Sequence, residues 1–181
     1  MFLHNLPRQK SLASLAISAI FLLWVAQSTA ENLSAKNENI LPPVELKKAA
    51  NLEADGREAG EKQIPVLMFF SMKHCPFCVE VEEDYLKPML RNSEYDSKII
   101  IRKVRIDEAD SVRNFSGKQR YAEDLGDDYN VSMVPTLILV DAKGNKIAKP
   151  IIGIANAHYY SDELDKAIAF STQKIRAIAK R

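Results

Sequence analysis

The chain alternates between short apolar runs and longer segments in which apolar residues recur every three or four positions. Two runs, residues 64–70 and 135–140, are almost entirely apolar, which predicts strands buried on both faces. Residues 98–107 alternate between apolar and polar side chains, which predicts a third strand. Helical spacing predicts four helices, over residues 44–58, 79–90, 119–129 and 161–180.

Glycine and proline suggest where these elements end. We expect Gly56 and Gly60 to end the first helix, and Pro88 to kink or end the second. The turn after the strand at 135–140 contains Gly144 where a positive φ is needed, which predicts a hairpin. Its returning strand, residues 145–153, contains Pro150, which predicts either an edge position in the sheet or a bulge there. Residues 108–117 are predicted to form a loop, and Ser161 to cap the last helix.

The order of these elements indicates an α/β protein. Helix, strand, helix, strand, helix, strand, hairpin strand and helix follow one another after residue 44. Strands that alternate with helices favour parallel pairing in a covered sheet, and a hairpin adds an antiparallel strand. We therefore expect one domain over residues 44–181, with a central mixed sheet of about four strands flanked by helices.

The first 30 residues have the pattern of a secretory signal peptide. Arg8 and Lys10 precede an uncharged, mostly apolar run from Ser11 to Val25, and small residues lead up to Ala30. The run is shorter than the ~20 residues of a membrane-spanning helix, so cleavage is favoured over a retained anchor. Residues 31–43 are polar, end in two prolines and are predicted to be a flexible tether. The expected location is the bacterial periplasm, or outside the cell.

Composition and charge argue against nucleic acid as a partner. The chain has 25 basic and 24 acidic residues, so it has no electrostatic footprint for nucleic acid. The apolar fraction of 46% is that of an ordinary globular domain. A basic cluster at the C-terminal end of the last helix is interpreted as a solvated helix end, because cations suit the helix dipole there. We expect a monomer.

Cys75 and Cys78 are the only cysteines, and they lie where a predicted strand gives way to a helix. A disulfide that closes so small a ring stabilises a fold little, which favours a reactive role over a structural one. At a helix start, free backbone N–H groups and the helix dipole should lower the pKa of Cys75. Lys73 and His74 add positive charge beside it. Cys75 is therefore the predicted nucleophile and Cys78 the resolving thiol.

Other interpretations of the cysteine pair are weaker. A zinc site needs a second pair of ligands at a recognisable spacing, and none follows, so no metal is assigned.

The residues after Cys75 fit the start of a helix, because Pro76 lies in the first turn, where its missing N–H leaves no hydrogen bond unmade. Glu82 and Glu83 are interpreted as part of a solvated helix face.

Two motifs give the chain a resemblance to the thioredoxin-like superfamily. They are the segment from Phe69 to Cys78, which ends in Cys-Pro-Phe-Cys, and the segment from Tyr129 to Leu137, which contains Val-Pro-Thr. Within that superfamily the chain resembles secreted disulfide-interchange proteins, such as the periplasmic thioredoxins associated with sulfur oxidation. The resemblance covers residues 44–180 and implies a thioredoxin-like fold.

The resemblance also implies a substrate groove. It implies that Pro135 is a cis-proline beside the cysteines and that Val134 offers its backbone to the substrate chain. His74, Pro76 and Phe77 complete the expected substrate-binding residues. Cytosolic thioredoxins carry a buried acid six residues before the first cysteine, whereas this chain has Phe69 there. No carboxylate is therefore evident to take the proton of Cys78.

These features together predict an exported thiol–disulfide oxidoreductase without an organic cofactor. Its expected partners are exported proteins with disulfides or thiols, and a membrane redox donor that resets the cysteine pair. We favour a reductase, while an oxidase stays open. Two further alternatives stay open: a glutathione-dependent enzyme of the glutaredoxin kind, and a thioredoxin-like module that binds a partner protein or copper.

Overall fold

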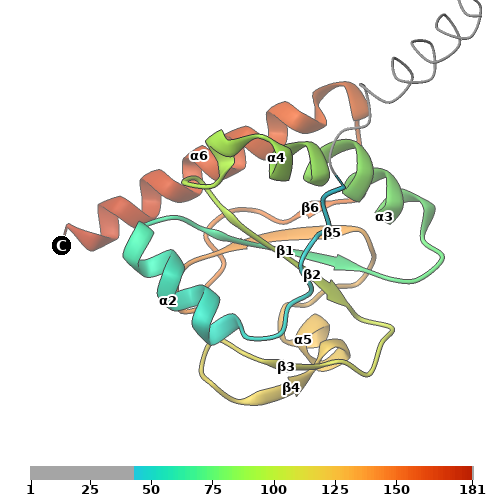
Figure 1. Cartoon of the computed structure of the whole chain (residues 1–181), viewed down its shortest axis with the longest axis horizontal. Helices are drawn as coiled ribbons and strands as arrows, with labels where there is room; N and C mark the ends of the chain where they lie inside the picture. Colours follow the sequence, from blue (N-terminus) through green and yellow to red (C-terminus); the bar gives the residue numbers. More distant parts are fainter. Residues whose placement is uncertain (1–42, 181) are drawn as a thin grey trace, which may run out of the picture. The chain divides into compact units, whose positions relative to one another are not determined.

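A four-stranded sheet organises the structure, a computed structural model that describes residues 43–180 (Figure 1). Its strands lie in the order β2 (Ile100–Arg105), β1 (Val66–Ser71), β5 (Thr136–Val140) and β6 (Ile151–Ile152). β1 pairs with β2 in parallel, whereas β5 pairs with β1 and β6 in antiparallel fashion. The predicted α/β fold with a mixed four-stranded sheet is confirmed.

The antiparallel pairing of β1 with β5 corrects the expectation that parallel pairs join the helix-linked strands. β2 ends beside Ser71, and β5 begins beside Phe70, so the intervening chain leaves and re-enters the sheet at the same end. A connection that does not cross the sheet must bring in the next strand in the opposite direction. As a result, the end of β1 and the start of β5 lie together.

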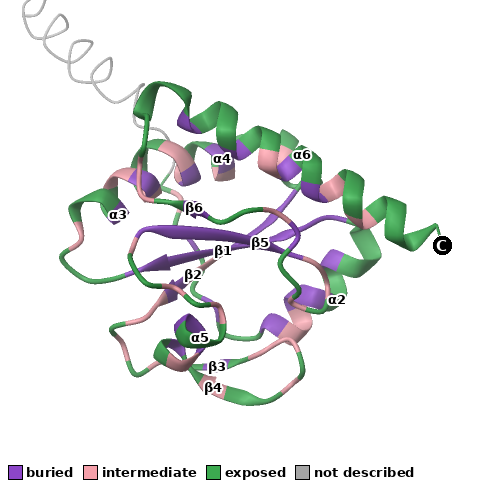
Figure 2. Ribbon diagram, turned by 180° about the vertical axis from the view of Figure 1, so that it is seen from behind, coloured by how far each residue is buried: buried purple, intermediate pink, exposed green. Residues whose placement is uncertain are grey.

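Helices cover both faces of the sheet (Figures 1 and 2). Leu67 and Phe69 of β1 point to one face, and Val66, Met68 and Phe70 point to the other. The first face is covered by α3 (Pro76–Glu80), η1 (Val81–Leu86), α4 (Lys87–Arg91) and α6 (Tyr160–Ala179). The second is covered by α2 (Leu52–Lys62), α5 (Ala122–Asp128) and a hairpin of β3 (Ser111–Arg113) and β4 (Gln119–Tyr121). All six residues of β1 are buried, as the apolar run predicts for a central strand.

The first predicted helix begins later than its spacing suggests. Residues 44–50 are extended, and the Ala49 N–H donates to the Lys103 carbonyl at 2.8 Å along the outer edge of β2. The Asn51 side chain caps α2 by accepting from the Ala54 N–H at 3.1 Å, so the helix starts at Leu52. Leu46 and Ala49 are buried from this extended segment, and their three-residue spacing mimics a helix.

Gly56 and Gly60 lie inside α2 instead of ending it. A Cβ on Gly56 would lie 2.4 Å from the Ala142 carbonyl oxygen, in the turn after β5. Glycine at this position therefore allows a close approach of backbone to helix, and it does not mark the end of the helix.

Three other boundaries differ from the prediction. The helix predicted over 79–90 does not end at Pro88 but continues to Arg91, and the π-helical segment η1 interrupts its α-helical geometry just before the proline. The predicted loop at 108–117 contains β3, and residues 119–121 form β4 before α5 begins. α6 starts at Tyr160, directly after the short 3-10 turn η3 (Ala157–Tyr159), so Ser161 is not its cap. Another 3-10 turn, η2 (Ser93–Tyr95), follows α4.

The hairpin after β5 is confirmed. Gly144 has a φ of 84°, and β6 lies at a sheet edge, although only two residues of its predicted span form the strand. The predicted signal peptide and residues 31–42 of the predicted tether lie outside the described residues. Among the helices of residues 43–180, none combines the length and apolarity needed to cross a bilayer.

Candidate active site at the end of strand β1

The cysteine pair follows β1 directly, at the point where the chain turns into α3. Cys75 has extended backbone angles and caps the helix, and the Cys78 N–H donates to the Cys75 sulfur at 3.2 Å. Pro76 occupies the first helical turn, as predicted. His74 just before has a φ of 60°, so the chain reverses sharply between strand and helix. The site is thus built by a central strand that delivers Cys75 to a helix start.

Cys75 and Cys78 form a disulfide, with their Cα atoms 5.2 Å apart. The two sulfurs differ in their access to solvent. Cys78 is 3% exposed and packs in the core beside Phe69, whereas Cys75 is half-buried at the edge of the same cluster. A substrate can therefore reach Cys75 and not Cys78, which fits the predicted roles of nucleophile and resolving thiol. Because both cysteines are oxidised here, the expected lowering of the Cys75 pKa stays a prediction.

The loop before β5 brings the second motif to the cysteines. The Val134–Pro135 peptide bond is cis, as the resemblance implied. Val134 and Cys75 pack against the same cluster of buried side chains. The Thr136 hydroxyl donates to the Met133 carbonyl at 2.8 Å, and the Gly153 N–H donates to the Pro135 carbonyl at 2.8 Å. These bonds hold the loop from both sides, while the backbone N–H and carbonyl of Val134 form no backbone hydrogen bond within residues 43–180.

The other predicted substrate-binding residues are exposed beside the disulfide. His74, Pro76 and Phe77 all face solvent, with Phe77 62% exposed. The structure also places three exposed apolar side chains at this end of the sheet that sequence reasoning missed: Met72, Met133 and Ile152. In the sequence, only the position of Met72 and Met133 within the two motifs could have indicated that they belong to the site.

Asp107 is a further residue of the site that the sequence did not reveal. Its carboxylate accepts from the Lys73 N–H at 2.6 Å and pairs with Arg105 at 3.1 Å. Burial raises the pKa of Asp107, but the hydrogen bonds from Arg105 and Lys73 outweigh it and leave the pKa below its ordinary value. The loop that carries His74 and Cys75 is thus tied to the end of β2.

Phe69 occupies the place where thioredoxins carry an acid, and it is fully buried. Its neighbours in the sheet are Lys103 on β2 and Leu137 on β5. β1 therefore offers no carboxylate to Cys78, as the sequence indicated. Over the described residues 43–180, no three side chains of His, Cys, Asp or Glu come together as metal ligands.

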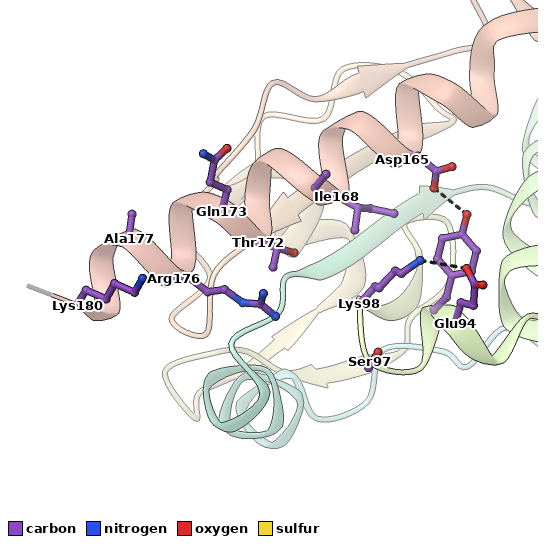
Figure 3. A pocket seen from close by; sticks show the side chains of 12 residues that line it. Glu94, Ser97, Lys98, Asp165, Ile168, Thr172, Gln173, Arg176, Ala177 and Lys180 are labelled. Carbon is purple, nitrogen blue, oxygen red and sulfur yellow. Dashed lines mark hydrogen bonds and ion pairs between the residues drawn. The ribbon is translucent and has the colours of Figure 1, made fainter.

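A groove lies away from the disulfide, between η2 and α6 (Figure 3). It has a volume of about 990 Å³, and Lys98 and Arg176 contribute to its wall. The Tyr95 hydroxyl donates to Asp165 at 2.7 Å within it, which raises the pKa of Tyr95 to about 12. Lys98 comes just before β2, whose Ile100 lies beside Val66 at the start of β1, so this groove is at the opposite end of the sheet.

Comparisons with known proteins agree with this geometry. A family model described as a thioredoxin-like domain matches residues 52–168. No curated protein matches the chain significantly in sequence.

Solved structures with a similar fold include three at low sequence identity. Oxidised mitochondrial thioredoxin 3 from Saccharomyces cerevisiae is 21% identical, with 68% of this chain and 93% of that chain covered and a TM-score of 0.43. A DsbH oxidoreductase is 16% identical, with coverage of 74% and 92% and a TM-score of 0.49. Trxlp from Edwardsiella tarda is 22% identical, with coverage of 66% and 98% and a TM-score of 0.46. On the family match and its disulfide-bonded Cys75–Cys78 pair, the chain belongs to the thioredoxin-like domain family and is a thiol–disulfide oxidoreductase.

Proposed function

We propose that the protein is exported and reduces disulfides in other exported proteins. The observation that carries the proposal is the unequal burial of the cysteine pair beside a free stretch of backbone. Cys75 is open to a partner, Cys78 is shielded, and Val134 has an unused N–H and carbonyl within the described residues. An extended protein segment can pair with such backbone groups while its own disulfide meets Cys75.

The reaction transfers two electrons from the reduced pair to the substrate. The Cys75 thiolate attacks one sulfur of the substrate disulfide, and the other sulfur leaves as a thiolate and takes up a proton. Cys78 then loses its proton and attacks the Cys75 sulfur, which releases the second substrate thiol and forms the Cys75–Cys78 disulfide. A membrane redox donor returns two electrons to the pair, which restores the Cys75 thiolate, and Cys78 regains its proton. The cysteines are the redox centre, so the cycle needs no organic cofactor.

The apolar side chains near the disulfide support a protein substrate. Met72, Phe77 and Met133 are each more than 40% exposed, which is unusual for side chains of this kind. Methionine is flexible and adapts to different partners, so it suits contact with several unfolded or loosely folded proteins. A small disulfide would gain little from such a surface.

Export is proposed from the leader alone, through its charged start, apolar run and small residues before residue 31. Fractionation of cells that produce the full chain should find it outside the cytoplasm and shortened by about thirty residues. A full-length cytoplasmic product would contradict this part of the proposal.

The substrate class is tested by trapping. Cys78→Ser leaves the nucleophile and removes the resolving thiol, so it should accumulate mixed disulfides with exported proteins. Cys75→Ser is the matched control and should trap none, because the nucleophile is missing. Equal trapping by both variants, or none by either, would argue against the proposed reaction.

Direction is tested by the equilibrium potential of the pair against glutathione. We expect a reduction potential of about −270 mV for the Cys75–Cys78 pair, as in reducing thioredoxins. A potential of about −120 mV would instead indicate an oxidase.

A further inference from the structure

An ion pair lies beneath the active-site helix, on the sheet face that also buries Cys78. Lys103 on β2 pairs with Glu82 of η1, and both side chains are less than a fifth exposed. Lys103 lies directly beside Phe69 in the sheet. Partly burying two charges is unfavourable unless they are paired, so this pair is a costly feature in a layer that is mostly apolar. It also corrects the interpretation of Glu82 as part of a solvated helix face.

Glu82 follows Cys78 by four positions in a continuous helical segment. Side chains four apart in an α-helix lie on one face, and Glu82 is only the second residue of the π-helical segment η1, so it stays on the same side of the helix as Cys78. Long helical side chains also point back toward the helix start, which directs the Glu82 carboxylate toward Cys78. Its contact with Lys103 fits this direction, because Lys103 neighbours Phe69 and Phe69 packs in the same cluster as Cys78.

Ser71 provides a second, independent observation on the same face. It is 1% exposed, and its hydroxyl has no hydrogen-bond partner within the described residues. Ser71 comes two positions after Phe69 on β1, so its side chain points to the layer that holds Cys78. A buried hydroxyl both donates and accepts, and one that is uncommitted can carry a proton between neighbours.

We propose that Glu82 accepts the proton of Cys78 when that thiol resolves the mixed disulfide, with Lys103 as the positioning residue. The inference rests on the proposed function and deepens it. The Cys78 S–H bond breaks, its proton passes to the Glu82 carboxylate with the Ser71 hydroxyl as bridge, and the thiolate attacks the Cys75 sulfur. The substrate sulfur leaves with the bonding electron pair. Glu82 returns the proton when the donor reduces the pair again.

The carboxylate nearest this layer is thus carried by the helical segment η1 and not by the central strand, and its cation is carried by β2. Arg105, on the same face of β2, is paired with Asp107 and Glu108, and β1 contributes no charged side chain. Tyr85 and Tyr160 stack in the same layer, and burial raises the pKa of both, so they stay neutral at physiological pH.

The test measures the two chemical steps separately across pH. Glu82→Gln should slow the resolution of a preformed mixed disulfide between Cys75 and a labelled peptide by about 100-fold at pH 7, the lower end for general-base catalysis. Its rate should then rise with pH as for an unassisted thiol. The first attack, measured in a Cys78→Ser background, should not change. Glu83→Gln is the matched control, because the neighbouring carboxylate is exposed and pairs with Lys87.

Glu82→Gln also leaves Lys103 buried without an anion, so stability needs its own control. The double variant Glu82→Gln/Lys103→Gln should recover thermal stability without recovering the resolution rate. Resolution rates and pH profiles that match those of Glu83→Gln would overturn the proposal, as would recovery of the rate in the double variant. If the wild-type protein forms no mixed disulfide at all, the proposed function fails instead.

Discussion

Gly56→Ala tests how closely α2 approaches the turn after β5. The added Cβ would lie 2.4 Å from the Ala142 carbonyl oxygen and 3.1 Å from a ring carbon of Phe115, whereas ordinary contacts begin at 3.4 Å. The closer neighbour is backbone and cannot rotate away. Either the helix or the turn must therefore shift by about 1 Å, and both are held by a packed core.

The size of the effect follows from two opposing terms. Alanine stabilises a helix over glycine by about 1 kcal/mol, whereas forcing extra atoms into a packed site costs about 1–3 kcal/mol or more. At this overlap we expect the free energy of unfolding to fall by about 2 kcal/mol in Gly56→Ala. With an unfolding entropy of about 2.1 cal/mol/K per residue over the 138 described residues, Tm should fall by about 7 °C.

Gly60→Ala is the matched control in the same helix. Its Cβ would lie 3.3 Å from the Ala142 side chain, which needs a shift of only a few tenths of an ångström. We expect its stability to stay within about 0.5 kcal/mol of the wild type or to rise slightly. Urea unfolding of the oxidised proteins measures the change in free energy of unfolding, and calorimetry measures the change in Tm. A Gly56→Ala protein as stable as Gly60→Ala would refute the close approach and the reason given for this glycine.

Three further predictions concern the site and its supports. Phe77→Ala should leave stability within about 0.5 kcal/mol, because the side chain is 62% exposed, yet raise KM for protein disulfides and not for a small aromatic disulfide. Asp55→Ala should cost about 3–5 kcal/mol in urea unfolding because it leaves Arg102 buried and unpaired, and a Leu/Leu double variant should recover most of that loss. Since the pKa of Asp107 is lowered, its contribution to stability should be complete above its ordinary value of 3.8 and be lost as pH falls through the folded value. Asp107→Asn should therefore show a smaller fall in stability between about pH 2 and 5 than the wild type. An equal fall in both proteins would contradict the roles given to Arg105 and Lys73.

The central strands could be predicted from sequence because burial on both faces leaves a continuous apolar run. β1 and β5 are such runs, and the antiparallel edge strand followed from Gly144 and Pro150. The extended segment before α2 could not be predicted, because its buried Leu46 and Ala49 are spaced like helix residues. β3 and β4 have three residues each, too few to establish an alternating pattern.

The disulfide-bonded pair at a helix start could be predicted from the three-residue spacing of Cys75 and Cys78 and the change from strand to helix around them. What surrounds them could not. Asp107 and Glu82 contact partners that lie 34 and 21 positions away in the chain, Lys73 and Lys103. A charged residue on an amphipathic helix looks solvated until the fold places a buried cation opposite it.

The two edges of the sheet determine how the protein behaves at high concentration. Residues 47–49 lie along the outer edge of β2, through the bonds of Lys103 to Lys47 and Ala49. The opposite edge strand, β6, has only two residues, and Pro150 precedes it. Exposed strand edges are where folded domains pair with one another and begin to aggregate. With one edge occupied and the other too short to pair, the domain offers little template for self-association.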